Sequence, residues 1–231
     1  MKKFLLFLGL LLIGNCVFAQ TIIVESGVNM DNFWTKNGKD AQKVLNVSKN
    51  LIHANELNRA TVIVERTWKT PKCSSNTYKK NIVINVGMLP YIDNDDELAY
   101  ILAHELALIQ ESYNGGLKLL AMSCNSKKYK SKADVKAIDY MVKAGYNPIS
   151  AIIMGNKIFE EPLWDWGFTS TAPKGSKRLI SMYKYIYKRY PSFLNSNLAK
   201  TSDFQNILKE NKKFISAFEQ KQKVKNRIGD L

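Results

Sequence analysis

Hydrophobic and polar residues are patterned along the chain with two periods, one typical of helices and one typical of strands. Apolar residues recur at helical spacing over 39–57 and 176–190, and two short runs rich in β-branched residues, 59–69 and 81–89, are typical of strands. Between these runs, residues 70–80 are rich in Pro, Ser and Asn, which predicts a turn. We therefore expect a small antiparallel hairpin or sheet that follows a first helix.

The most regular helical pattern follows the second strand, over about 95–113. Asn94 or Asp95 caps its beginning, three acids suit the positive end of the helix dipole, and Gly115 with Gly116 ends it. A loop at 162–175 and later helices are also expected, at about 131–144, 148–160, 176–190 and, as a Lys-rich amphipathic helix, 203–222. Strands and helices segregated in this way predict an α+β fold, mostly helical with a small sheet and no second domain.

The first 20 residues have the pattern of a secretory signal peptide. Lys2 and Lys3 stand before an apolar run over 4–13, and small residues follow at positions suited to cleavage. The run is too short to span a bilayer, and no later segment approaches transmembrane length. We therefore expect residues 1–19 to be removed and residues 20–231 to form a single exported domain, periplasmic or extracellular.

The three cysteines allow two further interpretations. Cys16 would carry a lipid in a lipoprotein, but Asn15 stands where a small residue is expected, so we favour cleavage. Cys73 and Cys124 remain, and two thiols in an oxidising compartment are able to form one disulfide, although their spacing leaves this pairing open. Because there is no C-x-x-C pair, no thiolate zinc site is indicated.

The chain is basic, with 34 Lys and Arg against 20 Asp and Glu and a net charge of +14. An exported protein seldom meets nucleic acid, so we exclude that class of partner. Anionic envelope polymers or lipid headgroups are the partners that suit this charge. Because the lysines are scattered along the chain, we favour the simpler interpretation that they solvate the surface.

The candidate chemistry lies in the helix at 95–113. His104 and Glu105 stand where the H-E-x-x-H motif of zinc proteases has its first His and its Glu, but Leu108 replaces the second His. Two His at i and i+4 face the same way and hold one ion, and the Glu activates the metal-bound water. The half motif indicates a metal site, a lost metal site or an ordinary buried helix.

The wider pattern resembles one family. Its characteristic pieces are ELAYILAHEL, KADVKAIDYMVKAGYNP and TSTAPKGSKRL, in this order. They are similar to segments of the zinc metallopeptidases of the CAAX prenyl protease type, gluzincins that include a periplasmic protease–chaperone, over roughly residues 39–190. The resemblance implies a zincin-like metallopeptidase fold in a soluble, exported version that acts in the cell envelope.

The resemblance also assigns roles to single residues. It implies that His104 is the first zinc ligand and Glu105 the general base, with Leu108 in place of the second ligand. Asp134 matches an Asp that stands four residues after the third ligand, a Glu. Lys130 takes the place of that Glu.

Two later positions complete this carry-over. Ala172 takes the place of a His that stabilises the oxyanion of the transition state, and Arg178 matches a basic position soon after it. Two of three zinc ligands and this His are thus replaced. Leu offers no lone pair and Lys at neutral pH is a cation with donors only, so we expect no bound zinc.

The residues leave two arrangements open for the lost metal. A His104, Glu111 and Asp134 set is a conceivable metal site, since Glu111 shares the helix face of His104.

Two tryptophans outside the metal site also allow two interpretations. Trp164 and Trp166 either line an old substrate groove or cap the core.

In the other arrangement, a lysine replaces the metal. The ammonium of Lys130 fills the vacated pocket and pairs with Glu105 or Asp134, while Leu108 closes the floor by apolar packing. Such a trade would keep the fold while discarding the zinc, without adding much stability, because desolvation offsets the attraction.

Three classes of function follow. We favour a metallopeptidase-family domain with a degraded zinc site, catalytically inactive and without cofactor, that binds a peptide or an envelope protein, for example by β-augmentation at a strand edge. The alternative is an active zinc metalloendopeptidase with an atypical metal site. The third is a structural or inhibitory partner of an active relative.

Overall fold

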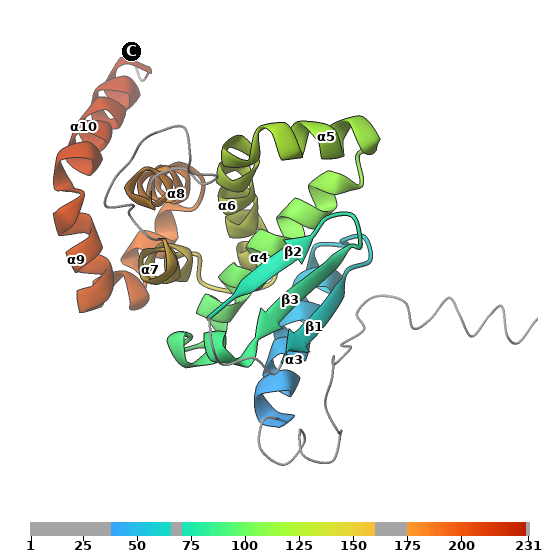
Figure 1. Ribbon diagram of the computed structural model, residues 1–231. Helices are drawn as coiled ribbons and strands as arrows, with labels where there is room; N and C mark the ends of the chain where they lie inside the picture. Colours follow the sequence, from blue (N-terminus) through green and yellow to red (C-terminus); the bar gives the residue numbers. More distant parts are fainter. Residues whose placement is uncertain (1–37, 66–70, 160–174, 230–231) are drawn as a thin grey trace, which may run out of the picture.

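The chain folds into helices packed around one small sheet (Figure 1). The computed structural model describes residues 38–65, 71–159 and 175–229. The expected α+β class, mostly helical with a small sheet, is confirmed for these residues. Within them, no helix combines the length and the apolar character needed to cross a membrane. The predictions that fall outside these ranges are those for residues 1–19, for the end of the strand run at 66–69, for the loop over 162–174, for Trp164 and Trp166, and for Ala172.

The sheet has three strands in the order β1-β3-β2. The strands are β1, Thr61–Glu65, β2, Cys73–Asn76, and β3, Asn81–Asn85. β1 runs parallel to β3, and β2 runs antiparallel to it. Because successive side chains of a strand point to opposite faces, one face of the sheet is apolar and buried. Its main residues are Val62, Val64, Ile82 and Ile84.

The antiparallel pairing expected for 59–69 and 81–89 was wrong, because these two runs contain β1 and β3, which pair in parallel. The hairpin is instead made by β2 and β3. β2 was read as turn because its sequence, Cys-Ser-Ser-Asn, lies at the sheet edge and lacks the apolar alternation of a half-buried strand. The turn itself is confined to 77–80, where Lys80 has a φ of 54°.

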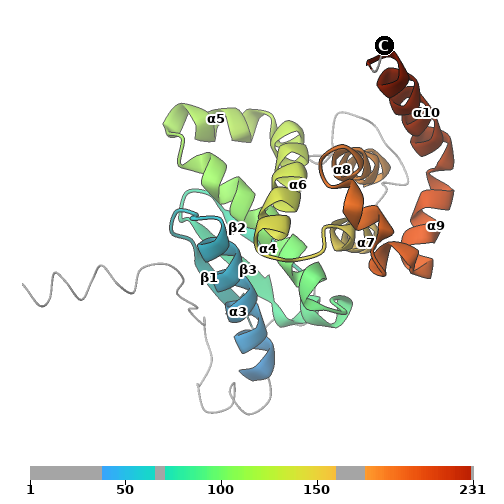
Figure 2. The same cartoon turned by 180° about the vertical axis from the view of Figure 1, so that it is seen from behind.

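Helices α3, Gly38–Ala54, and α4, Asp95–Ser112, pack against each other and against the sheet. Figure 2 shows α3 in front of the strands in the reverse view. α4 begins as expected, since the side chain of Asn94 accepts a hydrogen bond of 3.0 Å from the backbone N–H of Glu97. α4 is central, because it also packs against helices on its other sides.

The remaining helices form the layer beyond α4. They are α5, Gly116–Cys124, α6, Ser126–Lys143, α7, Ile149–Ile158, and α8, Gly175–Arg189. Of the 3-10 helices, η1, Val86–Tyr91, follows β3, and η2, Pro191–Asn195, and η3, Leu198–Lys200, follow α8. α6 packs beside α4, and α8 packs on α6 and α7. Sequence reasoning missed α5 and began α6 at about residue 131, five residues late. The second apolar run was also extended too far, because β3 ends at Asn85 and η1 follows.

The C-terminal part is two helices where one was expected. These are α9, Ser202–Glu210, and α10, Lys212–Gly229, and Asn211 lies between them. α9 packs on α7 and α10 on α8, so both lie on the side of the molecule away from the sheet (Figure 1). The side-chain amide of Asn211 donates to the carbonyl of Ile207 at 2.9 Å, which ends α9 with a local hydrogen bond.

Candidate functional site

His104 and Glu105 lie in the middle of α4, where the helix borders a cleft of about 540 Å³. Most neighbouring positions of α4 are buried, whereas the side chain of His104 is 12% exposed. Residues of β2, α6, α7 and α8 help to line the cleft. Its lining includes Cys73, His104, Glu105, Lys130, Phe159 and Arg178.

Asp134 of α6 is the buried centre of the charged contacts beside the cleft. Arg178 of α8 donates to it through Nε at 2.7 Å and Nη2 at 2.6 Å, and the hydroxyl of Tyr100 donates at 3.0 Å. Burial alone would raise the pKa of Asp134, but the hydrogen bonds from Arg178 and the contact with His104 outweigh it and lower the pKa. The carboxylate is therefore ionised and joins α4, α6 and α8.

Arg178 is held from a second side by an aromatic ring. Its guanidinium carbon lies 3.5 Å from the centroid of the Phe159 ring, just after α7, which is cation–π geometry. Gly155 allows this arrangement, because a Cβ there would lie 2.9 Å from Cε2 of Phe159 and 3.1 Å from side chains of α8. The close approach of α7 to α8 thus places the ring over the guanidinium.

His104 contacts the same carboxylate. Its Nδ1 lies 2.9 Å from Oδ1 of Asp134, but the N–H direction does not suit a hydrogen bond, so Nδ1 is a buried atom without a well-directed partner. The ring of Tyr100, one helical turn earlier, lies 6.3 Å from the His104 ring. The imidazole is therefore held by proximity to charge and by packing, at the side of the Asp134–Arg178 pair.

Glu105 faces the sheet edge. Its Oε2 accepts a hydrogen bond of 2.8 Å from the backbone N–H of Ser75, so the carboxylate caps an outward-facing amide of β2. Burial, and in second place Glu105, raise the pKa of the Cys73 thiol well above its usual value, so this thiol is protonated at neutral pH. Cys73 and Cys124 are both free, so the disulfide that the sequence left open is absent.

The expected pairing of Lys130 with Glu105 or Asp134 was wrong. Lys130 lines the cleft, but among the described residues it forms no ion pair with either carboxylate. Arg178 occupies Asp134 instead. The reason is geometric, because a guanidinium presents two parallel donors to a carboxylate and an ammonium does not.

Two further expectations for α4 are corrected. Leu108 is not among the residues that line the cleft; it is half-buried and packs against the hydrophobic core. Glu111 is turned to α5, where its Oε1 lies 2.6 Å from Nζ of Lys118. The conceivable set of His104, Glu111 and Asp134 is therefore not brought together, since Glu111 has another partner.

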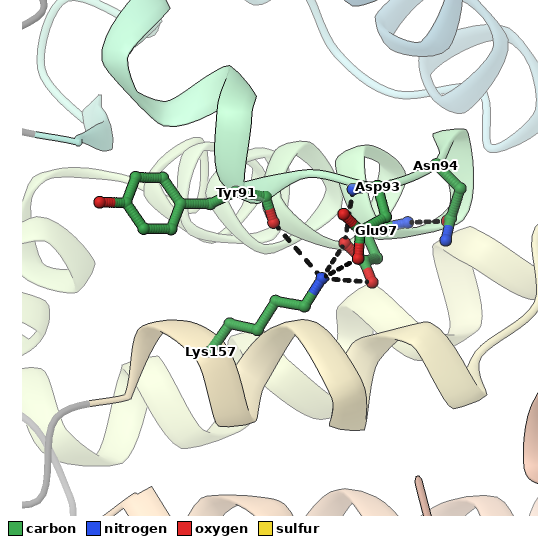
Figure 3. Close-up of polar contacts among 5 residues, drawn as sticks. All are labelled: Tyr91, Asp93, Asn94, Glu97 and Lys157. Atoms are coloured by element: carbon green, nitrogen blue, oxygen red, sulfur yellow. Dashed lines mark hydrogen bonds and ion pairs between the residues drawn. The ribbon is translucent and has the colours of Figure 1, made fainter. Parts of the chain in front are cut away.

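Lys157 of α7 lines the cleft and reaches the residues at the start of α4 (Figure 3). Its ammonium lies 2.6 Å from Oδ2 of Asp93 and 2.8 Å from Oε2 of Glu97, which is buried. Partial burial lowers the pKa of Lys157, but these hydrogen bonds outweigh it and raise the pKa. Glu97 also accepts from the backbone N–H of Asp93 at 2.9 Å, so the cap of α4 and the wall of the cleft share one network.

Sequence reasoning missed Tyr100, Phe159 and Lys157 as neighbours of the site. Tyr100 had a usable signal, because it lies four residues before His104 and so shares its helix face. The other two come from distant segments and carried no local signal. Two tyrosines of α8 contribute to packing away from the cleft lining, since Tyr183 is buried and the hydroxyl of Tyr185 donates to Asp139 at 2.6 Å.

The donors around His104 do not fit a zinc ion. Over the described parts of the chain, no group of three or more His, Cys, Asp or Glu side chains is placed to hold a metal. The side chains nearest to Asp134 are those of a cationic arginine, a tyrosine and one histidine. Lys72, Lys130 and Lys157 add further positive charges to the cleft lining, which would repel a dication.

In comparisons with known proteins, no family model matches this chain and no curated protein matches it significantly.

Proposed function

We propose that this chain is an exported domain on a zincin-like metallopeptidase scaffold that has lost its zinc chemistry and binds peptide segments of envelope proteins in the His104 cleft. The observation that carries the proposal is the buried ion pair of Asp134 and Arg178. The guanidinium of Arg178 binds the carboxylate beside His104, so that carboxylate is not available as a second metal ligand.

The scaffold part of the proposal is supported by how the residues are placed. His104 and Glu105 lie on one long helix beneath an edge strand, and Asp134 lies on the neighbouring helix. This is the arrangement that the resemblance to the CAAX prenyl protease type implies for the first ligand, the general base and the later Asp. Glu105 serves here as a cap for β2, so its carboxylate has a structural role that needs no metal.

Peptide binding is supported by the outer edge of β2. Backbone groups of a strand point alternately to its two sides. Those of Lys72 face β3, because its N–H donates to Oδ1 of Asn85 at 2.9 Å and its carbonyl accepts from the N–H of Asn85 at 3.0 Å. The N–H of Ser75 points the other way, to Glu105, so the backbone of Cys73 also faces outward, beside the cleft. An extended chain would therefore pair with β2 at Cys73, with Glu105 limiting the pairing beyond it.

The charge of the cleft specifies the peptide further. Lys72 and Lys130 line it, and neither has a carboxylate partner among the described residues. A peptide with an Asp, a Glu or a terminal carboxylate at this point would satisfy both, whereas a basic peptide would be repelled.

The proposal is tested on the purified chain without its first 19 residues. We expect substoichiometric zinc by elemental analysis, no cleavage of unfolded casein, and binding of acidic peptides from an immobilised peptide library. Lys130→Gln should weaken the best peptide about fivefold, since exposed charge contacts contribute a few-fold each. Lys136→Gln, an exposed lysine on the same helix outside the cleft, is the matched control. Stoichiometric zinc that is lost in His104→Ala would overturn the proposal in favour of an active peptidase.

The scaffold is tested separately by putting back the missing ligands. The double variant Leu108→His with Lys130→Glu restores a histidine at i+4 from His104 and a carboxylate from α6, which together make a three-ligand zinc set. We expect it to bind one zinc per chain and to lose it again when His104→Ala is added. A folded double variant that binds no zinc would argue against the zincin-like geometry.

A further inference from the structure

A second concave surface lies between α8 and α10, with a volume of about 1150 Å³. We call it the lysine groove and define it by four lysines, Lys184, Lys188, Lys221 and Lys225, and four apolar residues, Phe214, Ala217, Phe218 and Val224. It shares no residue with the lining of the His104 cleft. It lies among the C-terminal helices, on the side away from the sheet (Figure 1).

The apolar part of the lysine groove is unusually accessible. Phe214 is 60% exposed and Val224 is 54% exposed, which is high for large apolar side chains on one helix. Phe218 lies between them along α10 and packs edge-on against Tyr187 of α8, with ring centroids 5.5 Å apart. Phe214 and Val224 are ten positions apart on α10, so the apolar stripe spans about 15 Å, and Lys221 interrupts it between Phe218 and Val224.

Two of the lysines, Lys184 and Lys188, come from α8, whereas Lys221 and Lys225 share the α10 face of the apolar stripe. Lys184 and Lys188 of α8 place their ammonium groups 5.4 and 5.5 Å from the centroid of the Phe218 ring. The lining contains no acid, and among the described residues none of the four lysines forms an ion pair. The nearby Glu219 accepts a hydrogen bond from Tyr183 and is not part of the lining. The groove therefore brings four positive charges close to its apolar side chains.

We propose that the lysine groove binds an acidic amphipathic helix of another protein. Such a helix places apolar side chains on the Phe214–Val224 stripe and carboxylates beside the lysines of α8 and α10, which relieves the repulsion between them. The stripe matches about three helical turns. A second copy of this chain does not complement the groove through α10, which is itself lysine-rich, and a flat lipid surface does not enter a concave one.

The test uses a fluorescent 14-residue peptide with leucines at i, i+3, i+4 and i+7 spacing and glutamates on both flanks. The comparison peptide has the same composition in an order that scatters both residue types around the helix. We expect the patterned peptide to bind at least tenfold more tightly, measured by fluorescence anisotropy, because only it presents an apolar face with flanking acids.

Variants locate the binding. Lys184→Glu with Lys221→Glu, one from each side of the groove, should weaken the patterned peptide about tenfold, since each reversal removes an attraction and adds a repulsion. Lys209→Glu, an exposed lysine of α9 outside the groove, is the matched control and should change the affinity less than twofold. Circular dichroism confirms that each variant is folded.

Three outcomes would overturn the proposal: equal binding of both peptides, no effect of the double reversal in a folded variant, or binding to phosphatidylglycerol vesicles with no affinity for the patterned peptide. The test is independent of the function proposed for the cleft. Lys130→Gln should leave binding at the groove unchanged, so either site is able to fail without the other.

Discussion

The His104 cleft and the lysine groove are each lined by four Lys or Arg side chains, but two of those in the cleft are paired with carboxylates, whereas, within the described residues, none of those in the groove is. Beside the cleft, the buried Asp134 and Arg178 satisfy each other through two hydrogen bonds. In the groove, the lysines keep their ammonium groups at the surface and have no carboxylate partner among the described residues. Desolvation explains the difference, because an ion is buried only when it is paired.

The comparison separates two uses of charge in one protein. The paired charges join α4, α6 and α8 and belong to the stability of the fold. The unpaired charges add little to stability and remain available for a partner. Substitutions at the buried pair should therefore cost more stability than substitutions in the groove.

The largest expected effect comes from removing the guanidinium. Arg178→Met leaves the Asp134 carboxylate buried with weaker partners, and the loss of unfolding free energy should be about 3–5 kcal/mol. Urea unfolding followed by circular dichroism measures it. Adding Asp134→Leu to the same chain should restore much of the loss, since the uncompensated charge is then gone. A loss below about 1 kcal/mol in the single variant would mean that the pair is not structural.

Acid should weaken the same pair. The pKa of Asp134 is lowered from 3.8 in the folded chain, so the unfolded chain binds the proton more readily. The contribution of this group is therefore fully present above about pH 4 and is lost as the pH falls through the folded pKa. Unfolding free energies measured over this range should fall more steeply in the wild type than in Asp134→Asn. Parallel curves would contradict the assignment.

A smaller effect is expected where a charge caps the backbone. Glu105→Ala leaves the Ser75 amide without its acceptor and should cost about 1–2 kcal/mol, whereas Glu105→Gln keeps an acceptor oxygen and should cost less. Hydrogen exchange at the Ser75 amide should accelerate in the Ala variant. If both variants unfold alike and this exchange rate is unchanged, Glu105 does not cap β2 in solution.

The smallest effects belong to the lysine groove. Lys184→Ala and Lys221→Ala should each change the unfolding free energy by less than about 0.5 kcal/mol, because both are surface charges without an ion pair. The same urea titrations measure them beside Arg178→Met. A loss comparable to that of the buried pair would remove the contrast between the two regions.

Periodicity and caps made the central helices predictable. The start of α4 at Asn94 follows from the capping residue and the acids after it, and α8 follows from its apolar stripe. β2 was not predictable, because an edge strand packs one side only and Cys-Ser-Ser-Asn has no apolar alternation. The break at Asn211 was hidden by a Lys-rich pattern that continues across it.

For the candidate site, sequence reasoning named residues that do meet. His104, Asp134 and Arg178 are in direct contact, and Glu105 borders the same cleft. What it assigned wrongly was the cation, since it chose Lys130 for the place that Arg178 takes. The order of residues indicates which elements come together. The length of a side chain and its number of donors decide which of two cations forms the ion pair with a carboxylate.

Gly155 has a consequence for the electrostatics of the whole cleft. A methyl group at this position would lie 2.9 Å from Cε2 of Phe159 and would displace the ring. Moving the ring would admit water to the guanidinium of Arg178, raise the local dielectric constant and weaken its attraction to Asp134. The absence of a side chain at Gly155 on α7 therefore lets the Phe159 ring shield an ion pair between two other helices from water.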